Sequence, residues 1–310
     1  MTIQEIYEAW LPVKAFQVKE STLSTYMMCY RGMIKPTFGN KDYAEIKMAD
    51  LQDFITQQIQ DGKSRKTITD AMIIIKMLLC WAQEEYDLPP VPGRRKLIYP
   101  SENAGVGKKL DTYSIAEQKK LIEYCKENTT LETISIMLAL TTGLRIGELC
   151  GLQFGDFDFE NKTLTINRCV ERIYNMKNEG PRTKITIGTP KTISSHRVVP
   201  VQPYLLKIIK KYAAIYKPHF FLCSGKANPM EPRVLRSHFN AVCNEAGVRR
   251  IKFHGLRHTF ATTLLENKVD IKTTSEILGH SDVSITMNTY MHPSDEMKRN
   301  AVKSLNKLFD

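Results

Sequence analysis

Three short segments of the sequence carry residue types that could act on a phosphodiester. They are Thr142-Gly-Leu-Arg-Ile-Gly-Glu148, His254-Gly-Leu-Arg-His258, and Leu278-Gly-His280, which is followed ten residues later by Tyr290. Transfer of a phosphodiester without a metal requires cations that neutralise the non-bridging oxygens in the transition state. Two guanidiniums do this well, because each is a planar and permanently charged fork. Arg145 and Arg257 fit that requirement.

A nucleophile and proton carriers complete the candidate set. A free tyrosine has a pKa near 10, so only about one in a thousand is ionised at pH 7. Tyr290 as nucleophile therefore needs a proton acceptor or a strong positive field. We expect His254 to be that acceptor and His280 to hydrogen-bond the phosphate. The leaving oxygen needs a proton, which Lys191, on the turn before Arg197-Val-Val-Pro, could supply.

Each candidate also has a purely structural interpretation. Arg145 could pair on the surface with Glu148, which we expect to support the site without transferring protons. Lys177 and Lys184 lie close to Lys191 and could take its place. The two histidines and the tyrosine named above could simply be packed in a core. We interpret the remaining histidines as structural: His196, His219, His238, His258 and His292.

The sequence gives no reason to expect a cofactor. His254 and His258 have the i, i+4 spacing of a zinc helix, but the glutamate of His-Glu-x-x-His is absent, so we expect no metal. The seven cysteines are scattered, odd in number and never form Cys-x-x-Cys. That pattern argues against a disulfide framework and suits a reducing cytoplasm.

Composition and charge narrow the class of protein. The 310 residues are 42% hydrophobic and 25% charged, which is ordinary globular usage and excludes a disordered or fibrous chain. The formal net charge is +11, and 29 basic against 20 acidic residues follow residue 110. A surplus of this size favours a polyanionic partner, with nucleic acid ahead of a membrane surface. We expect neither a signal peptide nor a membrane span.

Hydrophobic periodicity predicts a helical first domain, residues 1–88. The first helix is indicated by an apolar repeat at Ile3, Ile6, Tyr7 and Trp10. Three more helices are predicted over 21–35, 48–60 and 64–88, and Pro36 and Gly39 are expected to end the second helix. Residues 89–112 are rich in Pro, Gly and basic side chains, which is typical of an extended linker. A third region, 113–310, contains predicted helices at 114–128, 131–142, 204–216, 231–245, 254–267, 271–278 and 294–308, with strands at 162–170, 183–187 and 198–201.

Taken together and in this order, the motifs resemble the tyrosine recombinase (phage integrase) family. The strings TTGLRIGELCGL, HGLRHTFAT and LGHSDVSITMNTYMH look most like integrases of conjugative transposons and temperate phages. The resemblance covers essentially the whole chain. It implies a mainly α fold with a small antiparallel sheet: a four-helix, SAM-like core-DNA-binding domain and a catalytic domain. It assigns the active site to Arg145, Lys191, His254, Arg257, His280 and Tyr290, with Glu148 in support.

The resemblance also implies an activity and partners. The enzyme would cut and rejoin double-stranded DNA at core recombination sites through a 3′-phosphotyrosyl intermediate, with neither ATP nor metal, and would integrate and excise a mobile element or prophage. It would act as a homo-tetramer on synapsed DNA, exchange its C-terminal helix between protomers, and work with an accessory excision factor. We expect it in the bacterial cytoplasm, on the nucleoid when bound.

Three other functions remain open from sequence. A type IB topoisomerase would share the chemistry but relax DNA without site preference. A DNA-binding regulator on this fold would form no covalent adduct, although the intact set of site residues argues against it. Within the recombinases, a Xer-like role in resolving chromosome dimers competes with mobile-element integration.

Two surfaces are predicted to contact partners. Basic residues in the linker and just before His254 could lie against DNA phosphates, although a solvated face is the alternative; they are Arg94, Arg95, Lys96, Arg233, Arg236, Arg249, Arg250 and Lys252. Met297, Val302, Leu305 and Leu308 form an apolar stripe in the last predicted helix, which would dock on a neighbouring protomer or pack within its own chain.

Overall fold

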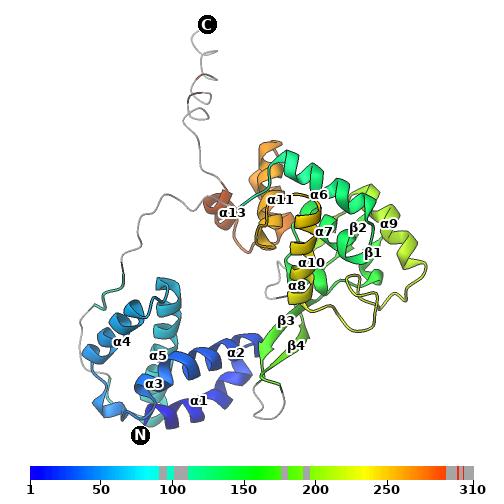
Figure 1. The fold of residues 1–310 in the computed structure, drawn as a ribbon. Coiled ribbons are helices and arrows are strands. Elements are labelled where there is room, and N and C mark those ends of the chain that lie inside the picture. Colours follow the sequence, from blue (N-terminus) through cyan, green and yellow to red (C-terminus); the bar gives the residue numbers. More distant parts are fainter. Residues whose placement is uncertain are drawn as a thin grey trace. The chain divides into compact units, whose positions relative to one another are not determined.

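The computed structural model describes residues 1–90, 96–100, 111–175, 181–190 and 196–290, together with Arg299 and Lys303. Contacts divide the chain into an N-terminal unit, Met1–Lys109 with Arg172–Lys184, and a C-terminal unit, Leu110–Glu171 with Ile185–Asp310 (Figure 1). The predicted mainly helical fold with small antiparallel sheets is confirmed. None of the described helices is long and apolar enough to cross a membrane.

The N-terminal unit is built from the predicted helices. They are α1 (Ile3–Gln17), α2 (Glu20–Cys29), α3 (Lys35–Phe38), α4 (Met48–Gln60) and α5 (Arg65–Tyr86). Thr2 and Ser64 cap α1 and α5 by accepting hydrogen bonds from backbone N–H groups of the first turn. The apolar face predicted for α1 is buried, and its Tyr7 ring stacks on Tyr30 with 3.5 Å between centroids.

Pro36 does not end the second helix, contrary to the sequence prediction. A π-helical turn, Tyr30–Ile34, joins α2 to α3, and the chain stays helical through Pro36 until Gly39. A proline ring clashes with the carbonyl four residues earlier and has no N–H to donate. The wider turn just before Pro36 relieves that conflict. With α2 and α3 joined, the described part of the unit has the four α-helical segments that the sequence predicts.

The C-terminal unit is arranged around one fully buried helix. Its helices are α6 (Ile115–Glu127), α7 (Leu131–Thr142), α8 (Ile146–Cys150), α9 (Pro203–Ala213), α10 (Pro232–Glu245), α11 (His254–Glu266), α12 (Ile271–Leu278) and α13 (Val283–Tyr290). Helix α7 is buried on all sides and packs against α6, α8, α9, α10 and α11. The sequence did not predict α8 or α13, both of which are short.

A small antiparallel sheet covers part of this core. Its strands are β1 (Phe157–Asp158), β2 (Thr163–Thr165) and β5 (Val198–Pro200), in the order β1-β2-β5, with Leu164 opposite Val199. The single strand predicted over 162–170 is instead two strands. Between them Arg168 turns inward, and its guanidinium donates to the buried carboxylate of Asp156 at 2.8 Å.

The second of these strands, β3 (Cys169–Tyr174), pairs with β4 (Thr183–Gly188) in a two-stranded hairpin. The outer part of the hairpin, Arg172–Lys184, belongs to the N-terminal unit. There the backbone N–H of Tyr174 donates to Ser24 Oγ at 2.7 Å, and the Lys184 ammonium lies 2.5 Å from Glu20. The predicted domain boundaries at 88, 112 and 113 place the whole hairpin in the catalytic domain, and they stay a prediction, because 91–95 and 101–110 lie outside the described residues.

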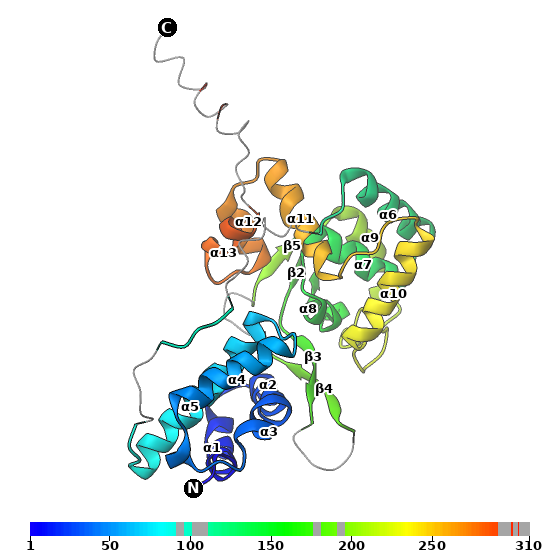
Figure 2. The ribbon, with the colours of Figure 1, turned by 60° about the vertical axis from the view of Figure 1, so that its left-hand side comes forward.

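Helices α11, α12 and α13, which come late in the sequence, pack together. Helix α12 packs against both α11 and α13, and the two views agree in placing α12 and α13 beside α11 (Figures 1 and 2).

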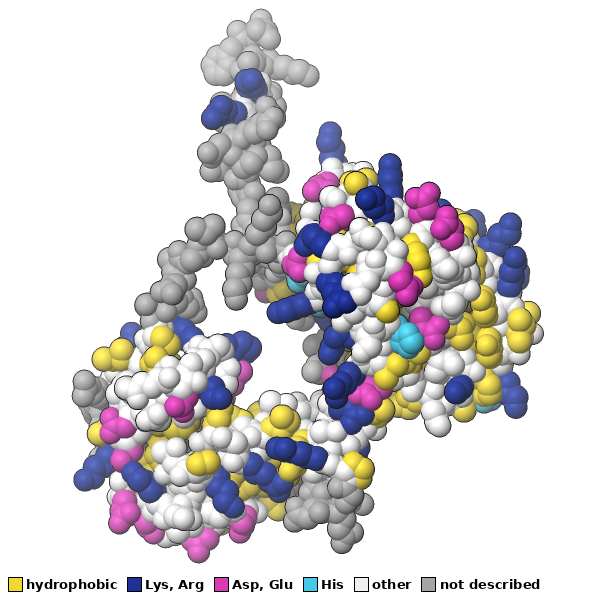
Figure 3. All heavy atoms as spheres, viewed as in Figure 1, with side chains coloured by type: hydrophobic (Ala, Val, Ile, Leu, Met, Phe, Trp, Pro, Cys, Tyr) yellow, Lys and Arg dark blue, Asp and Glu magenta, His cyan; other side chains and the backbone are white. Residues whose placement is uncertain are grey.

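Lys and Arg side chains are interspersed with Asp and Glu on the visible face of the C-terminal unit (Figure 3). The predicted terminal helix over 294–308, with its apolar stripe, lies outside the described residues except for Arg299 and Lys303.

Candidate active site

The two guanidiniums selected from sequence lie on different elements of the C-terminal unit. Arg257, on α11, is only 2% exposed, and its Nη1 donates to the carbonyl of Gly143 at 2.9 Å. Gly143 ends α7 with φ of 66°, and a Cβ there would lie 2.6 Å from the Phe260 ring. This left-handed glycine lets α7 end against α11. Among the described residues, Arg257 Nη2 is buried and has no hydrogen-bond partner.

Arg145 begins α8 and is held by Glu148. Its Nη1 lies 2.7 Å from the Glu148 carboxylate, which also accepts from the backbone N–H of Arg145 at 2.9 Å. Arg197, which directly precedes β5, donates to the same carboxylate at 3.2 Å and from its Nε to the carbonyl of Ile277 at 2.6 Å. The Glu148 side chain is 3% exposed. One buried carboxylate therefore orients two arginines.

The turn after α12 positions His280. Gly279 closes α12 with φ of 67°, and its carbonyl lies 3.5 Å from Arg145 Nη2. His280 Nδ1 is 2.7 Å from the hydroxyl of Thr286, a fully buried residue of α13. The Thr286 contact fixes the orientation of the imidazole beside Arg145.

Tyr290, the last residue of α13, contacts a histidine that the sequence interpretation set aside. Its hydroxyl lies 2.8 Å from Nδ1 of His258, and the two ring centroids are 5.6 Å apart. The expected acceptor was His254, one turn earlier on α11. The ring of His254 instead stands edge-on to His258, with 4.6 Å between centroids.

The electrostatics follow from this crowding of cations. Burial alone would raise the pKa of Glu148, but Arg197 and Arg145 more than offset it and hold that pKa below its usual value. Partial desolvation, neighbouring arginines and nearby histidines lower the pKa of His254 and of His280 to about 4. Burial lowers the pKa of Arg257 to about 9, with Arg145 adding to the effect. The site is thus a positively charged cluster of side chains whose imidazoles are neutral at pH 7.

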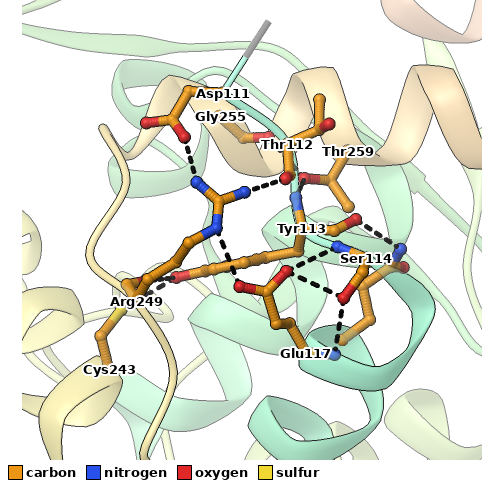
Figure 4. A network of polar contacts seen from close by, with 10 residues as sticks. Asp111, Thr112, Tyr113, Ser114, Glu117, Cys243, Arg249, Gly255 and Thr259 are labelled. Atoms are coloured by element: carbon orange, nitrogen blue, oxygen red, sulfur yellow. Dashed lines mark hydrogen bonds and ion pairs between the residues drawn. The ribbon is translucent and has the colours of Figure 1, made fainter.

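A second polar network fixes the far side of α11. The guanidinium of Arg249 faces Asp111, the carbonyl of Thr112 and Glu117 (Figure 4). The chain entering the C-terminal unit therefore lies against α11. There a Cβ on Gly255 would meet the Asp111 carbonyl at 2.6 Å. This contact explains the glycine between His254 and Leu256.

The predicted DNA contacts fall into three groups. Arg249 is engaged internally as just described, and Arg250 Nε donates to Asn244 at 2.7 Å. Lys96, Arg233, Arg236 and Lys252 are exposed on the surface. Arg94 and Arg95 lie outside the described residues, as does Lys191, the expected general acid.

Sequence reasoning missed His258, Thr286 and Arg197 as members of this site. His258 lies one turn after His254, so helical periodicity places both on one face of α11. No comparable signal identifies the other two, whose contacts arise only on folding.

Within the described ranges no cluster of three or more His, Cys, Asp or Glu side chains is arranged to hold a metal ion. The charge of the site comes from arginines.

Comparisons with known proteins identify the family of the chain. A model of the phage integrase family matches residues 114–297, and one of the phage integrase N-terminal SAM-like domain matches 2–58. The chain is 33% identical to a XerC-like tyrosine recombinase of Caldanaerobacter subterraneus subsp. tengcongensis, and the match covers all of this chain and 84% of that protein. It is 25% identical to the transposase of transposon Tn916 from Enterococcus faecalis, over 88% of this chain and 70% of that one.

Solved structures show the same fold. The integrase of transposon Tn1549 in complex with transposon right end DNA has a TM-score of 0.76 at 21% identity, covering 99% of this chain and 100% of that one. The family models together match more than half of the chain, and the three arginines, three histidines and tyrosine of the site lie inside the range 114–297. The chain therefore belongs to the phage integrase family and is a tyrosine-type site-specific recombinase, an enzyme that recombines DNA.

Proposed function

We propose that Tyr290 attacks the scissile phosphate of a DNA strand and forms a 3′-phosphotyrosyl link with release of a 5′-hydroxyl. The observation that carries this proposal is the arrangement on α11. A buried guanidinium nitrogen of Arg257 lacks a protein partner among the described residues, and one residue on, His258 holds the Tyr290 hydroxyl. A buried cation without a partner is costly, and an anion such as a phosphate oxygen would satisfy it.

The other residues have supporting roles in this proposal. The half-buried Arg145 binds the second non-bridging oxygen, and Glu148 together with Arg197 holds the Arg145 guanidinium in place. His280 and His254, both neutral, donate hydrogen bonds to the phosphate. Removing one such donor from a preorganised anion site costs roughly 10²–10³ in rate. Lys191 protonates the leaving oxygen, as the family pattern indicates. The covalent link conserves the phosphodiester energy, so the reaction needs no ATP.

The biological role follows from the reaction and from the relatives. We propose integration and excision of a mobile element, since conjugative-transposon and phage enzymes occur among the relatives beside Xer-type recombinases. Exchange between two duplexes requires each of four strands to be cut, so we propose a homo-tetramer on synapsed DNA, with the C-terminal helix exchanged between protomers and an accessory factor for excision. The bound enzyme would lie on the bacterial nucleoid.

The direct test is covalent trapping on a pool of nicked duplexes with randomised sequence around the nick. Cleavage near a nick releases a short fragment that diffuses away, so the adduct accumulates and its DNA can be sequenced. We expect wild type to yield adducts enriched in one site, and Tyr290→Phe to fold and bind that site without any adduct. Adduct in the Phe variant would move the nucleophile to another tyrosine. Adducts without sequence enrichment, with relaxation of arbitrary supercoiled plasmid, would indicate a topoisomerase.

A further inference from the structure

The structure places the Tyr290 hydroxyl against one particular base. His258 Nδ1 lies 2.8 Å from it, which is the distance of a good hydrogen bond. His254, the histidine of the His-x-x-Arg pattern, stands edge-on behind His258 rather than against the hydroxyl. The atom that would lose a proton during attack therefore faces His258.

Tyr290 needs such a partner because its surroundings do not ionise it. Burial raises the pKa of Tyr290 above its usual value, and the opposing effects of Arg257 and Arg145 do not overcome that. The phenolate fraction at neutral pH is then below the roughly one in a thousand of a free tyrosine. The positive field of the site alone does not activate the nucleophile.

His258 is in the right protonation state to accept. Burial, and secondarily Arg257, lowers its pKa below the usual value, so the ring is neutral at pH 7. If the phenol donates, Nδ1 must be the bare nitrogen and Nε2 must carry the proton. A bound phosphate would neutralise the nearby arginines and make the ring a stronger base just when the proton has to move.

We propose that His258 is a catalytic residue that accepts the Tyr290 proton during strand cleavage and returns it during rejoining. This inference rests on the proposed function. In cleavage, a bond forms between Tyr290 Oη and phosphorus while the bond from phosphorus to the 5′ oxygen breaks. The phenolic proton passes to His258 Nδ1, and the leaving oxygen takes its proton from a separate acid, for which Lys191 is proposed. Rejoining reverses each transfer, and His254 is left to bind the phosphate.

The first test is His258→Asn, whose side chain keeps a hydrogen-bonding atom near the position of Nδ1 but has no basicity near neutral pH. Single-turnover adduct formation is measured on the site recovered from the nicked pool. We expect a loss of about 10²-fold or more, as for removal of a general base. His219→Asn is the matched control, because His219 is an exposed histidine outside the site, and its rate should equal wild type.

A second arm separates proton transfer from positioning. Ring-fluorinated tyrosine at position 290 has a lower phenol pKa and therefore depends less on a base. If His258 accepts the proton, the ratio of wild-type to His258→Asn rates should shrink several-fold with the fluorinated nucleophile. An unchanged ratio would show that His258 only positions the ring, and an undiminished rate in His258→Asn would remove it from the chemistry. Absence of adduct in wild type would contradict the proposed function itself.

A third measurement needs no variant at all. Nitrogen NMR of the wild-type protein with labelled histidine reports which ring nitrogen carries the proton, and through-bond correlation of each ring with its own backbone amide assigns the signals. We expect His258 to be neutral with the proton on Nε2. A proton on Nδ1 would mean that His258 donates to Tyr290 and would overturn the inference even if His258→Asn fails to fold.

Discussion

Removing the charge of Glu148 should destabilise the C-terminal unit far more than removing an exposed carboxylate. The Glu148 side chain is 3% exposed and accepts from the guanidiniums of Arg145 and Arg197 at 2.7 and 3.2 Å. The change Glu148→Gln keeps the shape of the side chain but leaves these two cations without their counter-ion. The amide N–H₂ of the glutamine would also face a guanidinium, and two donors cannot form a hydrogen bond with each other.

The magnitude follows from the burial of the pair. Breaking a buried ion pair from one side costs about 3–5 kcal/mol, because a buried charge is left uncompensated. For a unit of this size each kcal/mol lowers Tm by roughly 2–4 °C, so Glu148→Gln should lower it by roughly 6–20 °C.

Asp111→Asn is the matched control in the same unit. Its carboxylate pairs with Arg249, but the two side chains are 50% and 47% exposed. An exposed pair contributes about 1 kcal/mol or less, so Tm should fall by less than about 4 °C. Differential scanning calorimetry of both variants without DNA compares them directly. Equal, small shifts would refute the view that Glu148 is the buried counter-ion of the site.

Two further predictions concern DNA. The logarithm of the affinity for the recovered site should fall linearly with the logarithm of the salt concentration, with a slope of about −0.9 per phosphate neutralised, because the +11 net charge favours phosphate contacts. An affinity that does not change with salt, measured by fluorescence anisotropy, would contradict this. Lys191→Ala should cleave ordinary DNA slowly but DNA with a 5′-bridging sulfur nearly as fast as wild type, because a thiolate leaves without a proton and an alkoxide does not. The sulfur should not rescue Arg145→Ala. Rescue of Arg145→Ala without rescue of Lys191→Ala would make Arg145 the general acid and Lys191 the residue that stabilises the phosphate charge.

Much of the fold could be predicted because its helices are regular and well capped. The repeat at Ile3, Ile6, Tyr7 and Trp10 gave the buried face of α1, and Ser64 marked the start of α5. The exceptions have two different causes. The π-helical turn relieves a local conflict between the Pro36 ring and the helix before it, whereas Arg168 turns inward to reach Asp156, 12 residues earlier.

The candidate site divides in the same way. Arg145, Glu148 and Arg257 lie in recognisable strings, and the structure brings them into one site. The partner of Tyr290 could not be read from those strings, because the pairing with His258 arises only when α13 folds against α12 and α11. Which of two histidines on one helical face meets the hydroxyl is decided by tertiary packing.

The most direct test of the central claim is to locate the covalent bond. Wild-type enzyme would be trapped on the recovered site, digested with protease and nuclease, and the nucleotide-bearing peptide sequenced by mass spectrometry. We predict a single modified peptide with the phosphate on the oxygen of Tyr290 and a 3′-linked nucleotide. A nucleotide on any other residue, or a 5′ linkage, would contradict the proposed mechanism.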